Sequence, residues 1–114
     1  MPARNLAGLR RTKAPDQPPR NRYGLIVATL HLVNKPAAWD GCHPLLDVED
    51  VVLLIEDGTY LAQQALSGAT LYALEPDIRA RGLSQRIQSN IRPASFDDFV
   101  RLVESCERVV TWSA

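Results

Sequence analysis

Two runs of apolar residues stand out in the hydrophobic pattern, because neither alternates with polar residues. Residues 23–33 are almost entirely apolar until His31, and residues 51–55 are five consecutive aliphatic residues followed by a Glu-Asp-Gly turn. Unbroken β-branched and aliphatic runs of this length are typical of strands that are covered on both faces. We therefore predict two buried strands of a parallel sheet at these positions.

The remainder of the chain alternates between helical and strand patterns. Strand composition returns at residues 70–74 and 108–112. Pro93 predicts that any strand at residues 91–94 is short or lies at an edge of the sheet, because proline lacks the amide that a central ladder needs. Helical patterns lie between these strands, at residues 37–48 (short or broken by Gly41 and Pro44), 59–66, 75–82 and 95–106.

The last of these helices has the clearest pattern. Ser95 is followed three residues later by Asp98, which is the spacing of a capping box at a helix start. A 3.6-residue period then predicts one apolar face, formed by Phe96, Phe99, Val100, Val103 and Cys106. About five strands that alternate with three or four helices predict a single α/β domain with a largely parallel sheet flanked by helices.

Composition divides the chain of 114 residues into two parts. Residues 1–22 contain six Lys or Arg residues against one Asp, and four of the eight prolines, so the formal charge of zero splits into +5 for this segment and −5 for residues 23–114. A segment so poor in large apolar residues cannot offset the entropy of ordering. We predict a disordered basic tail, with RNA binding as an alternative role, followed by one folded domain.

Several functional classes are not expected. No apolar run approaches the roughly 20 residues of a transmembrane helix, and none of secretory-signal type precedes Leu25. The two cysteines match neither a disulfide framework nor a zinc-ligand set, and there is no glycine-rich phosphate loop. These patterns favour a cytoplasmic protein without a metal or other cofactor.

Cys42 is the main candidate for covalent chemistry. It follows Gly41 in a polar segment expected to be exposed, and His43 beside it is able to lower the pKa of the thiol and make it a nucleophile. A persulfide carrier is one interpretation, and a small core residue is the other. Cys106, on the apolar helix face, is expected to be an inert core residue.

Three further residues are candidates for binding or for contacts between subunits. Asp57 closes the second central strand, where it either lines a cleft at the carboxyl end of the sheet or caps the following helix. His31 lies within the first strand, where it satisfies a backbone group or approaches a shared surface. Trp112 ends the last strand and is suited to packing or to a subunit contact.

Four separated strings resemble the TusB/DsrH family of sulfurtransferase subunits. They are Leu30-His-Leu-Val-Asn-Lys-Pro36, Leu53-Leu-Ile-Glu-Asp-Gly58, Tyr72-Ala-Leu-Glu-Pro-Asp77 leading to Ala80-Arg-Gly82, and Phe96-Asp-Asp-Phe-Val100 leading to Trp112. Their order and spacing match the family over about 80 residues. Between Lys35 and Cys42, however, the chain is several residues shorter than the family pattern.

The resemblance implies a DsrE/F/H-like fold and a heterohexamer with two related subunits, similar to TusC and TusD or to DsrF and DsrE. It also implies transfer of persulfide sulfur toward 2-thiolation of the tRNA wobble uridine, with an indirect link to tRNA through a downstream acceptor. Two alternatives remain open. One is a DsrH-like carrier in sulfur oxidation with Cys42 as the persulfide residue, and the other is an interaction module without a sulfur role.

Overall fold

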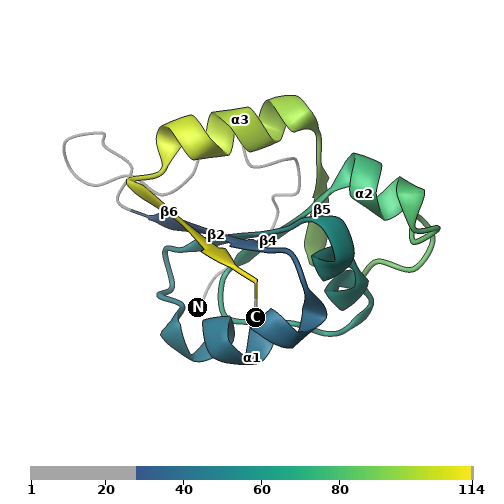
Figure 1. Ribbon diagram of the computed structural model, residues 1–114, viewed down its shortest axis with the longest axis horizontal. Coiled ribbons are helices and arrows are strands. Elements are labelled where there is room, and N and C mark those ends of the chain that lie inside the picture. Colours follow the sequence, from purple (N-terminus) through teal and green to yellow (C-terminus); the bar gives the residue numbers. More distant parts are fainter. Residues whose placement is uncertain (1–27, 114) are drawn as a thin grey trace.

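A five-stranded parallel sheet forms the centre of the computed structural model, which describes residues 28–113. The strands are β2 (Thr29–Val33), β3 (Val51–Leu54), β4 (Thr70–Leu74), β5 (Ile91–Ala94) and β6 (Arg108–Trp112). Their order is β5-β4-β3-β2-β6, and every neighbouring pair is parallel (Figure 1). The predicted fold class is therefore confirmed. The predicted tail, and residues 23–27 of the first predicted strand, lie outside the described residues.

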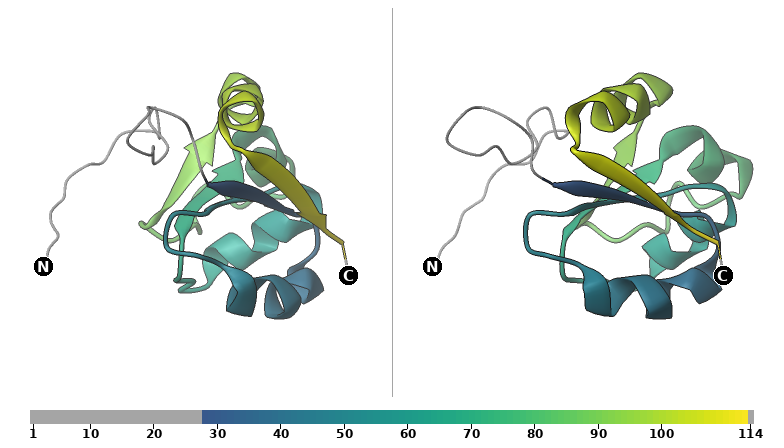
Figure 2. Two further views of the ribbon diagram at one scale, coloured as in Figure 1. Left: turned by 90° about the vertical axis from the view of Figure 1, so that its left-hand side faces the viewer. Right: turned by 60° about the vertical axis from the view of Figure 1, so that its left-hand side comes forward.

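Helical segments cover both faces of the sheet (Figures 1 and 2). The segments η1 (Pro36–Ala38), α1 (Trp39–Cys42), η2 (His43–Leu45) and η3 (Glu56–Gln63) lie on one side, and α3 (Phe96–Ser105) crosses the other. The helix α2 (Glu75–Ala80) follows β4 directly. Prolines at the starts of η1 and η2 divide the connection between β2 and β3 into short turns, as the sequence predicts for residues 37–48.

The central strand β3 explains why its sequence is uniformly apolar. Successive side chains of a strand point to opposite faces, and here both faces are covered. Val52 and Leu54 belong to the core on the α1 side, whereas Val51 and Leu53 belong to the core beneath α3. All four side chains are buried.

The helix predicted at residues 59–66 is placed differently in the structure. A 3-10 helix occupies Glu56–Gln63 instead, starting three residues earlier. It begins with a tight turn in which the Gly58 amide donates to the Ile55 carbonyl at 2.8 Å and the Thr59 hydroxyl donates to the Glu56 carbonyl at 2.7 Å. These hydrogen bonds outweigh the helical spacing of the aliphatic residues that follow.

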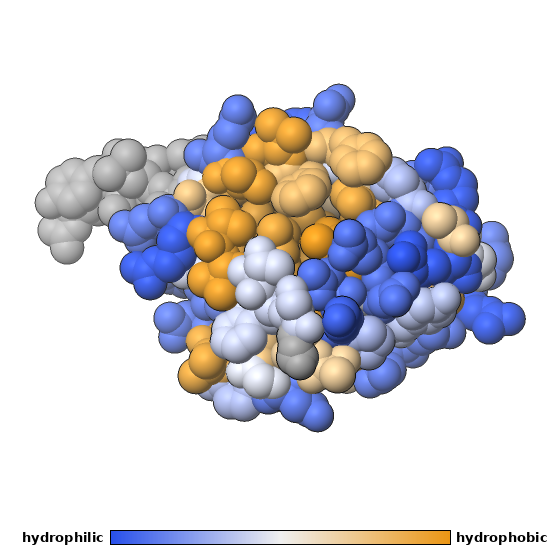
Figure 3. Space-filling model, viewed as in Figure 1, coloured by the Kyte–Doolittle hydropathy of each residue, from blue (hydrophilic) through white to orange (hydrophobic). Residues whose placement is uncertain are grey.

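The capping box of α3 is confirmed, but its predicted apolar face is only partly correct. Ser95 and Asp98 bond reciprocally at the helix start. The stripe that packs on the sheet consists of Phe99, Leu102 and Cys106. The neighbouring stripe points outward, with exposed fractions of 59% for Phe96, 55% for Val100 and 41% for Val103. Together with the exposed Val109 they contribute to an apolar surface over α3 and β6, seen in Figure 3.

The strand order fixes where a site is expected. The chain steps from β2 through β3 and β4 to β5, which lies at one edge as Pro93 predicts, and then crosses to β6 on the other side of β2. This reversal places a topological switch point between β2 and β6. In open parallel sheets, ligands and partners gather outside the carboxyl ends of the strands at such a point.

Candidate functional site at the carboxyl ends of the strands

The Glu-Asp-Gly turn after β3 presses against the end of β2. The Val33 carbonyl accepts a hydrogen bond from the Ile55 amide at 3.0 Å. A Cβ atom added to Gly58 would lie only 1.9 Å from the same carbonyl oxygen. Glycine is therefore required at position 58 because two backbone segments meet there. This packing brings the turn beside the switch point between β2 and β6.

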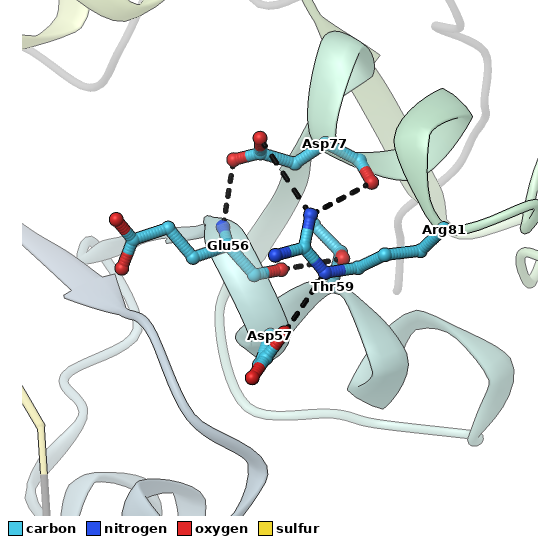
Figure 4. Close-up of polar contacts among 5 residues, drawn as sticks. All are labelled: Glu56, Asp57, Thr59, Asp77 and Arg81. Atoms are coloured by element: carbon cyan, nitrogen blue, oxygen red, sulfur yellow. Dashed lines mark hydrogen bonds and ion pairs between the residues drawn. The ribbon is translucent and has the colours of Figure 1, made fainter.

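Helix α2 clamps the turn with two side chains, as Figure 4 shows. The Asp77 carboxylate accepts a hydrogen bond from the Glu56 amide at 2.7 Å. The Arg81 guanidinium donates to the Asp57 carboxylate at 3.0 Å and to the Asp77 carbonyl at 3.3 Å. The candidate residue Asp57 thus lies at the predicted edge of the sheet, exposed and paired with Arg81 rather than capping a helix.

Glu56 has an unusual backbone conformation. Its φ angle is +51°, which is the left-handed region that non-glycine residues rarely occupy. Its side chain is exposed and points away from the Asp77–Arg81 pair in Figure 4. Such strain persists where the surrounding structure enforces it, and it is concentrated at functional positions. We infer that the turn presents the Glu56 carboxylate at the surface at some cost in stability.

Replacing Glu56 with glycine should therefore stabilise the fold. We expect the free energy of unfolding to rise by about 0.5 to 1 kcal/mol, because glycine adopts a positive φ without steric cost. The greater conformational freedom of glycine in the unfolded chain offsets part of this gain. Urea denaturation measures the change. Glu56→Ala is the matched control, since it removes the carboxylate but keeps the strain. Equal stability of the two variants would contradict a strained turn.

A second set of polar side chains links β6, β2 and the residue that precedes β3 on the α1 side of the sheet. The indole Nε1 of Trp112 donates to Nδ1 of His31 at 3.0 Å, and Nε2 of His31 lies 2.9 Å from the Asp50 carboxylate. The rings of His31 and Trp112 are stacked, with centroids 6.1 Å apart. His31 therefore bonds to side chains and not to a backbone group, contrary to one of its two predicted roles. Asp50 was not among the predicted site residues.

The two sets meet at the end of β2. Val33 pairs in register with Trp112, and its carbonyl accepts the hydrogen bond from Ile55 at the start of the Glu-Asp-Gly turn. The backbone amide of Asn34 donates to the Trp112 carbonyl at 3.2 Å, and the side-chain amide of Asn34 donates to the Ser113 hydroxyl at 3.0 Å. The structure thus brings Asp57 and Trp112 to one edge of the sheet, flanking the last residues of β2. His31 is buried beneath that edge and bonds to Trp112.

The predicted exposure of Cys42 is wrong. The residue is 0% exposed and belongs to the core on the α1 side. Burial, and after it the negative charge of Asp50, raises the pKa of the Cys42 thiol to about 11. The neighbouring imidazole of His43 packs at a tilt against the Trp39 ring instead, with ring centroids 5.2 Å apart. The role of Cys42 as a persulfide carrier stays a prediction, and the structure presents an enclosed, protonated thiol at this position.

Native protein should react slowly with thiol reagents at Cys42. A pKa of about 11 in place of 9.0 reduces the thiolate fraction at pH 8 by about 100-fold, and enclosure slows the reaction further. We expect alkylation of Cys42 only on unfolding. Iodoacetamide labelling followed by peptide mass spectrometry measures it, with the urea-unfolded chain as the control. Equal labelling rates in the folded and unfolded states would contradict the enclosed thiol.

Cys106 fits its predicted role as a core residue. It is buried at the end of α3 and packs in the core beneath that helix. Burial raises the pKa of its thiol, with a smaller contribution from the charge of Asp50. Within residues 28–113, no group of His, Cys, Asp and Glu side chains is arranged to hold a metal ion, and no helix is long and apolar enough to span a membrane.

Comparison with known families places the site in context. The model of the DsrH family, described as "DsrH like protein", matches residues 35–109. The chain belongs to the DsrH family. The matched residues include Cys42, the Glu-Asp-Gly turn, α2 and α3, and they exclude His31 and Trp112.

Known relatives and a solved structure agree with membership of the DsrH family. Protein TusB of Photorhabdus laumondii is 36% identical over 69 residues, covering 60% of this chain and 73% of the relative. Protein TusB of Sodalis glossinidius is 42% identical over 71 residues, covering 55% and 75%. The solution NMR structure of protein Tm0979 from Thermotoga maritima superimposes with a TM-score of 0.56 at 28% identity, covering 67% of this chain and 91% of that one.

Proposed function

We propose that this chain is an accessory subunit of a sulfur-relay complex that passes persulfide sulfur toward 2-thiolation of the tRNA wobble uridine. Membership of the DsrH family and similarity to proteins called TusB support the relay. The burial of Cys42 is the observation that supports an accessory role instead of a sulfur-carrying one, because a persulfide carrier needs a thiolate that another protein is able to reach. The chain then supplies binding surface while a partner's cysteine carries the sulfur.

The surface of the domain supports assembly with other subunits. Four apolar side chains remain exposed on α3 and β6, namely Phe96, Val100, Val103 and Val109. Apolar surfaces of this kind commonly mark sites of protein contact. Asp57 and Trp112 add polar and aromatic groups at the adjacent edge of the sheet. We propose two DsrE/F/H-like subunits, similar to TusC and TusD, as the partners, and the cytoplasm as the location.

Co-expression with the two flanking open reading frames tests the proposal. We expect the three proteins to purify together, at a mass well above the 12.7 kDa of this chain. The matched variants are Val100→Lys, which places a charge on the exposed stripe, and Arg101→Lys, which keeps the charge of the adjacent exposed position. Assembly should be lost only with Val100→Lys. A stable monomer that binds neither of the two co-expressed proteins would contradict the proposal.

A further inference from the structure

Asp50 is a buried carboxylate that accepts hydrogen bonds from three directions. It is 5% exposed and lies immediately before β3, at the amino end of the sheet. Its Oδ1 accepts from the Thr29 amide at 3.1 Å. Its Oδ2 accepts from the Asp47 amide at 3.1 Å and faces Nε2 of His31 at 2.9 Å. The carboxylate is thereby held in one orientation.

The charge of Asp50 is maintained despite its burial. Burial by itself raises the pKa of the carboxyl group, but the hydrogen bonds from Asp47, His31 and Thr29 outweigh it, and the net result is a lowered pKa. At neutral pH the carboxylate is ionised and has no proton to donate. Any hydrogen bond between Asp50 and His31 must therefore use a proton on the imidazole.

Trp112 fixes the other side of the same imidazole. An indole N–H is only a donor, so Nδ1 of His31 must be unprotonated to accept from Trp112 at 3.0 Å. The single proton of the neutral ring then resides on Nε2, where Asp50 accepts it. With the proton on Nδ1 instead, two N–H groups would face each other and the bond to Trp112 would be lost. One tautomer satisfies both neighbours.

We propose that Asp50 is a positioning residue, which selects the Nε2-protonated tautomer of His31 and thereby holds Trp112 in place at the carboxyl end of β6. The linkage runs from the amino end of β3, through the middle of β2, to the last residue of β6. Trp112 is half-buried and is flanked by the exposed Thr111 and Ser113. What its exposed part contacts rests on the proposed function, whereas the positioning does not.

Two nearly isosteric substitutions separate hydrogen bonding from packing. Asp50→Leu fills the same space without an acceptor, which leaves the Nε2–H of His31 without a partner and removes the preference for the required tautomer. Asp50→Asn retains one acceptor oxygen. When this oxygen faces His31 and Asp47, only the bond from Thr29 is lost, so the tautomer and the bond to Trp112 remain.

Nitrogen-15 NMR of the full chain at neutral pH provides the test. In the wild type, we expect Nδ1 of His31 to be unprotonated and the Trp112 indole signal to show a hydrogen-bonded proton, assigned by comparison with Trp39→Phe. Asp50→Asn should keep both features, and Asp50→Leu should lose the hydrogen-bonded indole signal. Trp112→Phe provides the reference for complete loss.

An unchanged Trp112 indole signal in folded Asp50→Leu would overturn the proposal, as would protonated Nδ1 in the wild type. If Asp50→Leu does not fold, the wild-type tautomer and Asp50→Asn still decide the matter, because loss of the indole bond in Asp50→Asn contradicts the expected arrangement. Failure of the proposed function has a different signature. The wild type would then bind no related subunit, while the NMR difference between the Leu and Asn variants would persist.

Discussion

Replacing Gly58 with alanine should lower the free energy of unfolding by about 3 kcal/mol or more, the upper range for overpacking of a rigid site. The added Cβ would lie 1.9 Å from the Val33 carbonyl oxygen and 2.8 Å from its carbon. Both are backbone atoms of a central strand, so no side-chain rotation relieves the clash. Either β2 or the turn must move, and the hydrogen bond from Ile55 to Val33 would be strained or lost.

Gly41→Ala is the matched control for this substitution. A Cβ at position 41 meets only the Trp112 ring, at 3.8 Å, which is ordinary van der Waals contact. Gly41 also lies within α1, where alanine is favoured over glycine by up to about 1 kcal/mol. Urea denaturation should show a large loss for Gly58→Ala and no loss for Gly41→Ala. Similar stabilities would contradict the close approach of the turn to β2.

Deletion of the gene should abolish 2-thiolation of the wobble uridine in the affected tRNAs. The proposed relay depends on an assembled complex, so the absence of one subunit is expected to stop sulfur transfer even if that subunit carries no sulfur. Complementation with Cys42→Ala should restore thiolation, because the thiol is enclosed in the core. Liquid chromatography and mass spectrometry of tRNA nucleosides measure the modified base.

Cys106→Ala is the matched control for complementation, since it removes another buried thiol at similar cost in packing. Protein levels and unfolding temperatures of the two variants distinguish instability from lost chemistry. Restoration by Cys106→Ala but not by an equally abundant Cys42→Ala would show that Cys42 takes part in the relay. Unchanged thiolation after deletion would contradict the proposed pathway itself.

Local patterns were sufficient to predict the positions of several strands along the chain and the start of α3. The aliphatic run at residues 51–55 corresponds to the buried strand β3. Pro93 correctly indicated that the strand at residues 91–94 is short or at an edge, since β5 has four residues and lies at one edge. The capping box of Ser95 and Asp98 fixed the start of α3. Each of these features is set by a few consecutive residues. The capping box depends on hydrogen bonds within one segment, and the aliphatic run reflects burial of both faces of a strand. Such constraints are visible in a single sequence.

The missed features depend on contacts between distant segments. Asp50 and His31 are 19 residues apart, and His31 and Trp112 are 81 residues apart, so no local pattern joins them. The polar neighbours of Cys42 suggested exposure, but the broken helix turns its thiol into the core. On α3, periodicity identified apolar positions without showing which stripe meets the sheet. A signal was nevertheless present in Asp50, a charged residue directly preceding a fully apolar strand.

The location of transferred sulfur tests the accessory role most directly. The assembled complex should be treated with a persulfide donor, and each subunit then analysed by intact-mass and peptide mass spectrometry. An added sulfur increases the mass by about 32 Da. We predict this increase on a cysteine of a partner subunit and none on Cys42. A persulfide on Cys42 of the folded complex, lost with Cys42→Ser, would contradict the account and identify this chain as a sulfur carrier.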